Sequence, residues 1–131
     1  MPISNRSDEE RVDAYFRWLD GDDRQQKQNE WAHSELWELT VLDPERAWPL
    51  TLSIIRRTPE DFRAMASATG WIQNILKHHG PQFIERVEAL SYADPHFRKH
   101  LFMLNERALA PEVFARVRHT LAGESYTPPF E

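Results

Sequence analysis

Five prolines divide this chain into short segments, and they constrain its fold more than any other feature of the sequence. They occur in the pairs Asp43-Pro44, Thr58-Pro59, Gly80-Pro81, Asp94-Pro95 and Ala110-Pro111. Proline is favoured in the first turn of a helix, because its missing N–H would have no intrahelical partner there. In three of the pairs the preceding Asp or Thr is an N-cap residue type. Each pair is therefore predicted to begin a helix.

Apolar residues recur at helical spacing within these segments and before the first of them. The helices predicted in this way cover residues 7–20, 25–42, 44–57, 59–68, 71–79, 81–92, 95–109 and 111–121. Thr69-Gly70 and Gly80 are expected to end two of them, and helix 44–57, apolar nearly all round, is expected inside the bundle. A phenylalanine follows four of the prolines, and each ring is expected to be buried: Phe62, Phe83, Phe97 and Phe114.

No segment alternates apolar and polar residues with period two, so no strand is predicted. The sequence therefore predicts an all-α protein. Seven to eight short helices would form stacked antiparallel αα-hairpins, in a HEAT-like arrangement or an irregular helical bundle. The length of 131 residues fits one helical domain spanning 1–131, with residues 1–6 and 124–131 as flexible or extended tails.

Composition excludes several classes of function. The chain has no cysteine, which rules out disulfides, thiolate nucleophiles and zinc ribbons. No apolar run approaches the length of a membrane span and no signal peptide is recognisable, so a cytoplasmic location without membrane contact is expected. Asp and Glu number 21 against 16 Lys and Arg, and the net charge of −5 argues against nucleic acid as the main partner.

Part of the chain, from Trp48 to about Leu104, resembles a bacterial family known as domain of unknown function 6869. The residues that carry the resemblance are Ala47-Trp48-Pro49-Leu50, Trp71-Ile72-Gln73-Asn74-Ile75-Leu76-Lys77-His78-His79-Gly80, Phe83-Ile84-Glu85-Arg86-Val87-Glu88-Ala89-Leu90 and Asp94-Pro95-His96-Phe97-Arg98. The resemblance implies an all-helical bacterial protein and no particular activity.

The sequence has no recognisable catalytic centre. No serine lies in a Gly-x-Ser-x-Gly turn, and four glycines are too few for a phosphate-binding loop. His96 and His100 have the i, i+4 spacing of two metal ligands on one helix, with Glu88 as the carboxylate that would complete the site. The alternative is that both histidines are ordinary boundary residues. We expect a non-enzymatic protein that needs no cofactor.

Two tryptophans lie off the apolar stripes of the first two predicted helices, among carboxylates. Exposed aromatic residues within a charged rim are typical anchors of protein interfaces. The alternative is that each ring packs against a second neighbouring helix. The residues predicted to bind a partner are Trp18, Asp22, Asp23, Glu30, Trp31, Glu35 and Glu38.

A small acidic helical protein without catalytic residues is compatible with several roles. The first hypothesis is an inhibitor that occludes another protein, such as a basic toxin or effector, in the manner of a bacterial immunity protein. The second is a helical adaptor or homo-oligomeric scaffold, and the third is a metal-dependent enzyme that uses His96 and His100.

Overall fold

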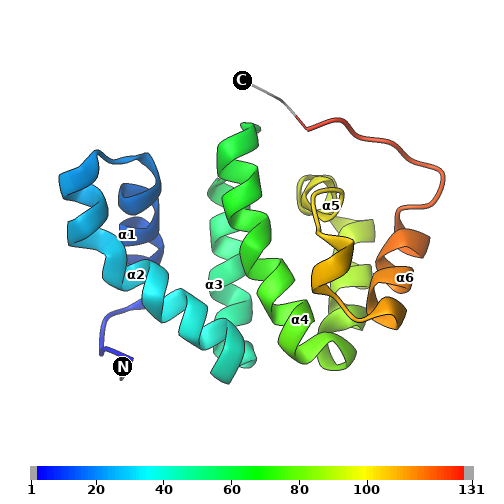
Figure 1. The fold of residues 1–131 in the computed structure, drawn as a ribbon, viewed down its shortest axis with the longest axis horizontal. Helices are drawn as coiled ribbons and strands as arrows, with labels where there is room; N and C mark the ends of the chain where they lie inside the picture. Colours follow the sequence, from blue (N-terminus) through cyan, green and yellow to red (C-terminus); the bar gives the residue numbers. More distant parts are fainter. Residues whose placement is uncertain (1–2, 129–131) are drawn as a thin grey trace.

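The computed structural model describes residues 3–128, and in that range the chain forms six α-helices, one 3₁₀ turn and no strand (Figure 1). The α-helices are α1 (Asp8–Asp20), α2 (Asp23–Leu42), α3 (Pro44–Arg57), α4 (Phe62–Ala93), α5 (Pro95–Leu101) and α6 (Pro111–Thr120), and the 3₁₀ turn η1 covers Glu106–Ala108. The prediction of an all-α protein is confirmed. Within the described residues, no helix is both long enough and apolar enough to cross a bilayer.

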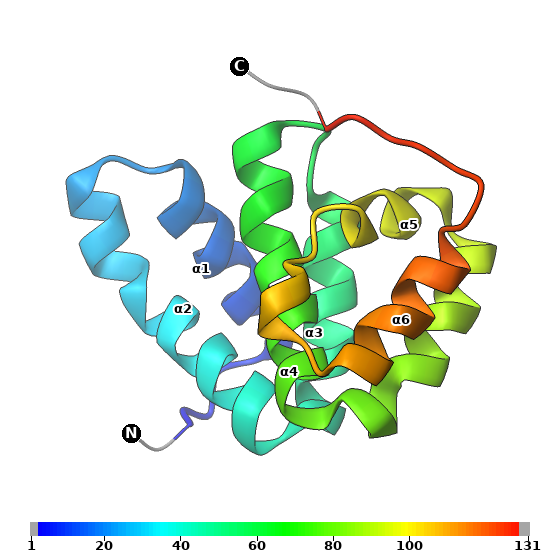
Figure 2. The same cartoon turned by 45° about the vertical axis from the view of Figure 1, so that its right-hand side comes forward.

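The long helix α4 lies in the middle of the molecule and contacts α2, α3, α5 and α6 (Figures 1 and 2). α1 and α2 pack against each other at one end, and α5 and α6 lie at the other end. Because α4 serves both ends, the helices form an irregular bundle rather than a regular row of hairpins. This is one of the two arrangements that the sequence predicts.

Aspartate side chains begin most of the helices. Asp43 and Asp94 accept hydrogen bonds from backbone N–H groups of α3 and α5, as predicted for the residues before Pro44 and Pro95. The prediction that Thr58 caps a helix starting at Pro59 is wrong. The hydroxyl of Thr58 donates to the carbonyl of Ile54 at the end of α3, and Asp61 caps α4 instead. An aspartate therefore replaces the predicted threonine as the cap.

The predicted break at Thr69-Gly70 is also wrong, because α4 continues through both residues. A helical glycine costs only about 1 kcal/mol relative to alanine, and burial of Trp71 and Ile72 beside it offsets that cost. The second predicted boundary, at Gly80-Pro81, appears as a kink. His79 has non-helical angles (φ −139°, ψ 33°), and the helix resumes after it. Three predicted helices are thus one kinked helix.

The core is made by the apolar stripes of all six helices. Ala32, Leu36 and Leu39 of α2 are buried as predicted, but α3 exposes Pro49 and Arg56 and is therefore amphipathic rather than apolar all round. Of the four phenylalanines predicted to be buried, Phe83 and Phe97 are, whereas Phe62 is 37% exposed and Phe114 is half-buried. The largest fully buried apolar side chains are Tyr15, Phe83, Phe97, Leu36, Leu39, Leu50, Ile54, Ile55, Met65, Ile72 and Ile75.

Both terminal segments are packed where the structure describes them. Ser4 hydrogen-bonds to Glu35 of α2, and the Tyr126 ring lies 5.9 Å from that of Phe102. The tail after Gly123 has no helix and runs back toward the start of α4, where the Tyr126 hydroxyl meets Met65 (Figure 1). The predicted tails also include residues 1–2 and 129–131, which lie outside the described residues.

Replacing each of the two glycines of α4 by alanine is expected to have opposite effects on the free energy of unfolding. At Gly80 a Cβ atom would lie 2.7 Å from a methyl carbon of Val113 on α6, whereas at Gly70 it would meet nothing within 4 Å. Gly80→Ala is expected to lower the free energy of unfolding by about 1–3 kcal/mol. Gly70→Ala is expected to raise it by about 0.5–1 kcal/mol, because alanine is the better helix former. Urea denaturation measures both, and equal effects would contradict the close α4–α6 contact.

Candidate functional site

The negative charge of the chain is concentrated in its first two helices. Residues 1–43 contain 11 of the 21 Asp and Glu but only 5 of the 16 Lys and Arg, which gives this segment a formal net charge of −6. The rest of the chain carries +1. Because α1 and α2 pack together at one end, that end is acidic and the remainder of the molecule is nearly neutral (Figure 1). A polarised charge of this kind steers a basic molecule to one face.

An open hollow of about 760 Å³ lies within this acidic end. It is lined by Trp18 of α1 and by six residues of the first half of α2: Asp23, Arg24, Gln26, Lys27, Gln28 and Glu30. Three of the predicted partner-binding residues, Trp18, Asp23 and Glu30, are therefore brought together. The hollow combines one large aromatic ring with carboxylates, amides and two cations, a mixture that suits a polar protein surface.

The remaining predicted residues of this surface have different environments. Asp22 is exposed, but its side chain accepts a hydrogen bond from the backbone N–H of Gln25 as the N-cap of α2. Trp31 and Glu38 are half-buried and do not line the hollow. Glu35 is buried, so its placement on an exposed acidic rim is wrong.

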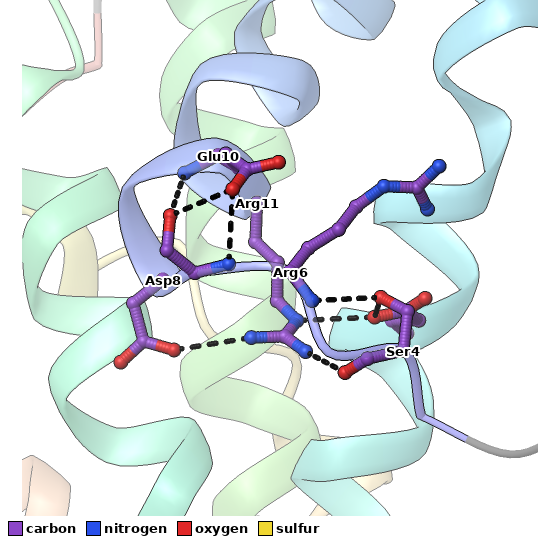
Figure 3. A network of polar contacts seen from close by, with 7 residues as sticks. Ser4, Arg6, Asp8, Glu10 and Arg11 are labelled. Carbon is purple, nitrogen blue, oxygen red and sulfur yellow. Dashed lines mark hydrogen bonds and ion pairs between the residues drawn. The ribbon is translucent and has the colours of Figure 1, made fainter.

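Glu35 is buried because it neutralises Arg11, whose side chain is 1% exposed. The Arg11 guanidinium donates to Glu35 (3.0 Å), to Asp8 (3.2 Å) and to the backbone carbonyl of Ser4 (2.8 Å). The Ser4 hydroxyl also donates to Glu35. Figure 3 shows Arg11 reaching from α1 between Asp8 and Ser4. Glu35 thus joins α1, α2 and the N-terminal segment and is a structural residue.

His33 connects the acidic end to α4 through tilted ring contacts. Its centroid lies 4.5 Å from that of Trp18 and 5.0 Å from that of Trp71 on α4. Burial lowers the pKa of His33, so the ring is neutral at pH 7. The Tyr15 ring packs on Trp71, and burial raises the pKa of its hydroxyl. One side of the Trp18 ring therefore contacts His33, which in turn contacts Trp71, and Trp18 remains half-buried.

Both histidines considered as a metal site bond to backbone carbonyls, His96 to one of α3 and His100 to one within α5. Nε2 of His96 lies 2.9 Å from the carbonyl oxygen of Ile55, and Nδ1 of His100 lies 3.0 Å from that of His96. Each of these nitrogens donates its proton to a carbonyl. Glu88 pairs with Arg116 of α6. Among the described residues, no three His, Cys, Asp or Glu side chains form a group that could hold a metal.

Sequence reasoning missed the most exposed tryptophan. Trp37 of α2 is 50% exposed, and Leu42 at the end of the same helix is 71% exposed. Trp37 follows Glu30 by seven residues, so the two share one side of α2. That spacing was readable in the sequence and is the signal that would have identified Trp37.

The family of unknown function DUF6869 matches residues 20–125, which is most of the chain. The chain belongs to the DUF6869 family. The match includes α2 to α6 and begins at the last residue of α1. No curated protein and no solved structure matches the chain. Family membership assigns no activity to the DUF6869 fold.

Removing the Glu35 carboxylate from this DUF6869 protein is expected to destabilise it strongly. Glu35→Ala would leave Arg11 buried without its main counter-charge, which costs about 3 kcal/mol or more. Glu30→Ala, on the exposed side of the same helix, is the matched control and should change the free energy of unfolding by less than about 0.5 kcal/mol. Chemical denaturation tests both. Similar effects of the two variants would contradict the separation of structural from exposed carboxylates.

Acidification is expected to destabilise the fold through His33 and His100, because burial lowers the pKa of both rings. As the pH falls through about 6.5, both histidines become protonated in the unfolded chain before they do so in the folded chain. The free energy of unfolding therefore decreases. His33→Phe keeps a ring between Trp18 and Trp71 but cannot be protonated. It should reduce the loss of stability between about pH 7.5 and pH 5.5, and an unchanged loss would contradict a neutral His33 in the folded chain.

Proposed function

We propose that this protein is a non-enzymatic inhibitor that binds and occludes a basic partner protein, in the manner of a toxin-neutralising immunity protein of the bacterial cytoplasm. The observation that carries the proposal is the acidic end formed by α1 and α2, in which Trp18 lies in a hollow beside Asp23 and Glu30. The partner is expected to be a basic toxin or effector.

The charge distribution supports fast and directed association. A net charge of −6 on residues 1–43, against +1 on the rest, attracts a basic protein to the α1–α2 end in preference to the other faces. Complementary charge of this kind can raise the association rate from about 10⁵–10⁶ to 10⁸ M⁻¹s⁻¹ or more at low salt. Tight binding then requires apolar contact as well.

Trp18 supplies that contact at low entropic cost. Its ring contacts His33, which contacts Trp71, so the indole is held in place before a partner binds. A pre-positioned aromatic ring loses little conformational freedom on binding, which favours affinity. Asp23 and Glu30, which line the hollow together with Arg24 and Lys27, then pair with basic groups of the partner.

A second candidate function is a helical adaptor or homo-oligomeric scaffold. The exposed side chains of Trp37 and Leu42 on α2 favour it, because they lie outside the hollow and would be covered by a second copy of the chain or by another protein.

Charge reversal at the hollow tests the proposed function. The tagged protein is used to recover partners from the native lysate, and the main stoichiometric partner is then purified and its activity assayed with and without this protein. Asp23→Lys/Glu30→Lys is expected to slow association at low salt by more than about tenfold. Glu85→Lys/Glu106→Lys, which reverses two exposed carboxylates elsewhere, is the matched control and should have little effect.

Two outcomes would contradict the inhibitor function. One is a partner that binds both double variants equally well, and the other is a partner whose activity is unaffected by saturating protein. Recovery of this chain alone, together with concentration-dependent sedimentation, would instead support the scaffold.

A further inference from the structure

An arginine of the N-terminal segment lies on the tryptophan of α2. The guanidinium carbon of Arg6 is 3.8 Å from the centroid of the Trp31 ring. Arg6 is exposed and Trp31 is half-buried, so the stacked pair is at the surface. Tryptophan is the best ring partner for a cation, and a planar guanidinium can lie against its face.

The segment that carries Arg6 is held at its backbone. The Ser4 carbonyl accepts a hydrogen bond from Arg11, and the Ser4 hydroxyl donates to Glu35. The backbone N–H of Arg6 lies 3.4 Å from the same hydroxyl. Figure 3 shows the Arg6 side chain extending away from this network toward α2. The side chain could therefore leave Trp31 while the Ser4 network remains intact.

We propose that the Trp31 ring is a binding site for an arginine side chain of the partner protein, and that Arg6 occupies this site in the free protein. The inference rests on the proposed function, because it identifies the chemistry of the basic partner. The structure already shows the ring holding a guanidinium, and the net charge of residues 1–43 attracts a second one. The partner's arginine displaces Arg6 and takes its place.

The Trp31 ring itself discriminates between arginine and lysine. Arginine stacks through its planar guanidinium, whereas the ammonium of lysine is a more strongly hydrated point charge and competes less well with Arg6. Arg6 also lowers the affinity for every incoming cation, because the site must be vacated first. This cost is the same for arginine and lysine, so the preference for arginine comes from the ring and not from the competition.

The test uses the five indole N–H signals of the ¹⁵N-labelled full chain at low salt, with the Trp31 signal assigned through Trp31→Phe. The probes are blocked hexa-arginine and hexalysine peptides. Hexa-arginine is expected to shift the Trp31 signal saturably, and hexalysine to bind more weakly. An exposed cation–π contact corresponds to about a two- to fivefold change in affinity, so Arg6→Ala should bind hexa-arginine tighter by that factor.

Arg6→Lys separates displacement from simple electrostatics, because it keeps the charge and weakens the stacking. Displacement predicts that Arg6→Lys also binds hexa-arginine tighter than the unmodified protein, though less so than Arg6→Ala. The inference is overturned if Arg6→Lys binds no tighter than the unmodified protein, if the Trp31 signal stays unchanged, or if only another tryptophan responds.

The experiment also distinguishes the two proposals. A silent Trp31 signal, together with a partner that is lost on Asp23→Lys/Glu30→Lys, would overturn the arginine site and leave the proposed function standing. A saturable Trp31 response together with a partner insensitive to that charge reversal would overturn the proposed function and leave the arginine site standing.

Discussion

The whole bundle depends on the path of α4. Pro81 has no N–H to donate to the carbonyl of Lys77, and the helix bends at His79 just before it. The first part of α4 packs on α1 and α2 through Trp71, and the part after the kink carries Phe83 and Val87 into the core. Gly80 lets α6 approach at the bend, where Val113 occupies the space of a side chain. One helix can therefore serve both ends of the molecule.

Some carboxylates of the acidic end are bonded within the fold, and others are exposed to solvent. Glu35 is used internally to neutralise Arg11, and Asp22 is used to begin α2. Asp23 and Glu30 remain at the surface beside Trp18. The same net charge of −6 thus contains groups that hold α1 on α2 and groups that are free to attract a partner. Substitutions of the first group are expected to change stability, and only those of the second group test binding directly.

The three tryptophans of this end occupy three different environments. Trp18 is supported by His33 and lines the hollow, Trp31 is covered by Arg6, and Trp37 is exposed. In the proposed complex, Trp18 would be a rigid anchor and Trp31 would bind an arginine in competition with Arg6. Membership of the DUF6869 family supplies no substrate or partner, so these contacts are the basis for assigning a function.

The sequence by itself determined the all-α class, most helix starts and the inward face of α2. These are local properties: a proline at a first turn, an aspartate cap and apolar residues at helical spacing act within a few residues of each other. Only the tertiary structure decided whether Gly70 would interrupt a helix and where Glu35 would lie. Burial of Trp71 and Ile72 overrides the weak propensity of glycine, and the buried charge of Arg11, 24 residues away in sequence, draws Glu35 inward. The candidate site was predictable in part for the same reason. Trp18 and Glu30 follow from helical position, whereas the hollow, the ring contacts of His33 and the covering of Trp31 by Arg6 depend on contacts between segments that helical periodicity does not describe.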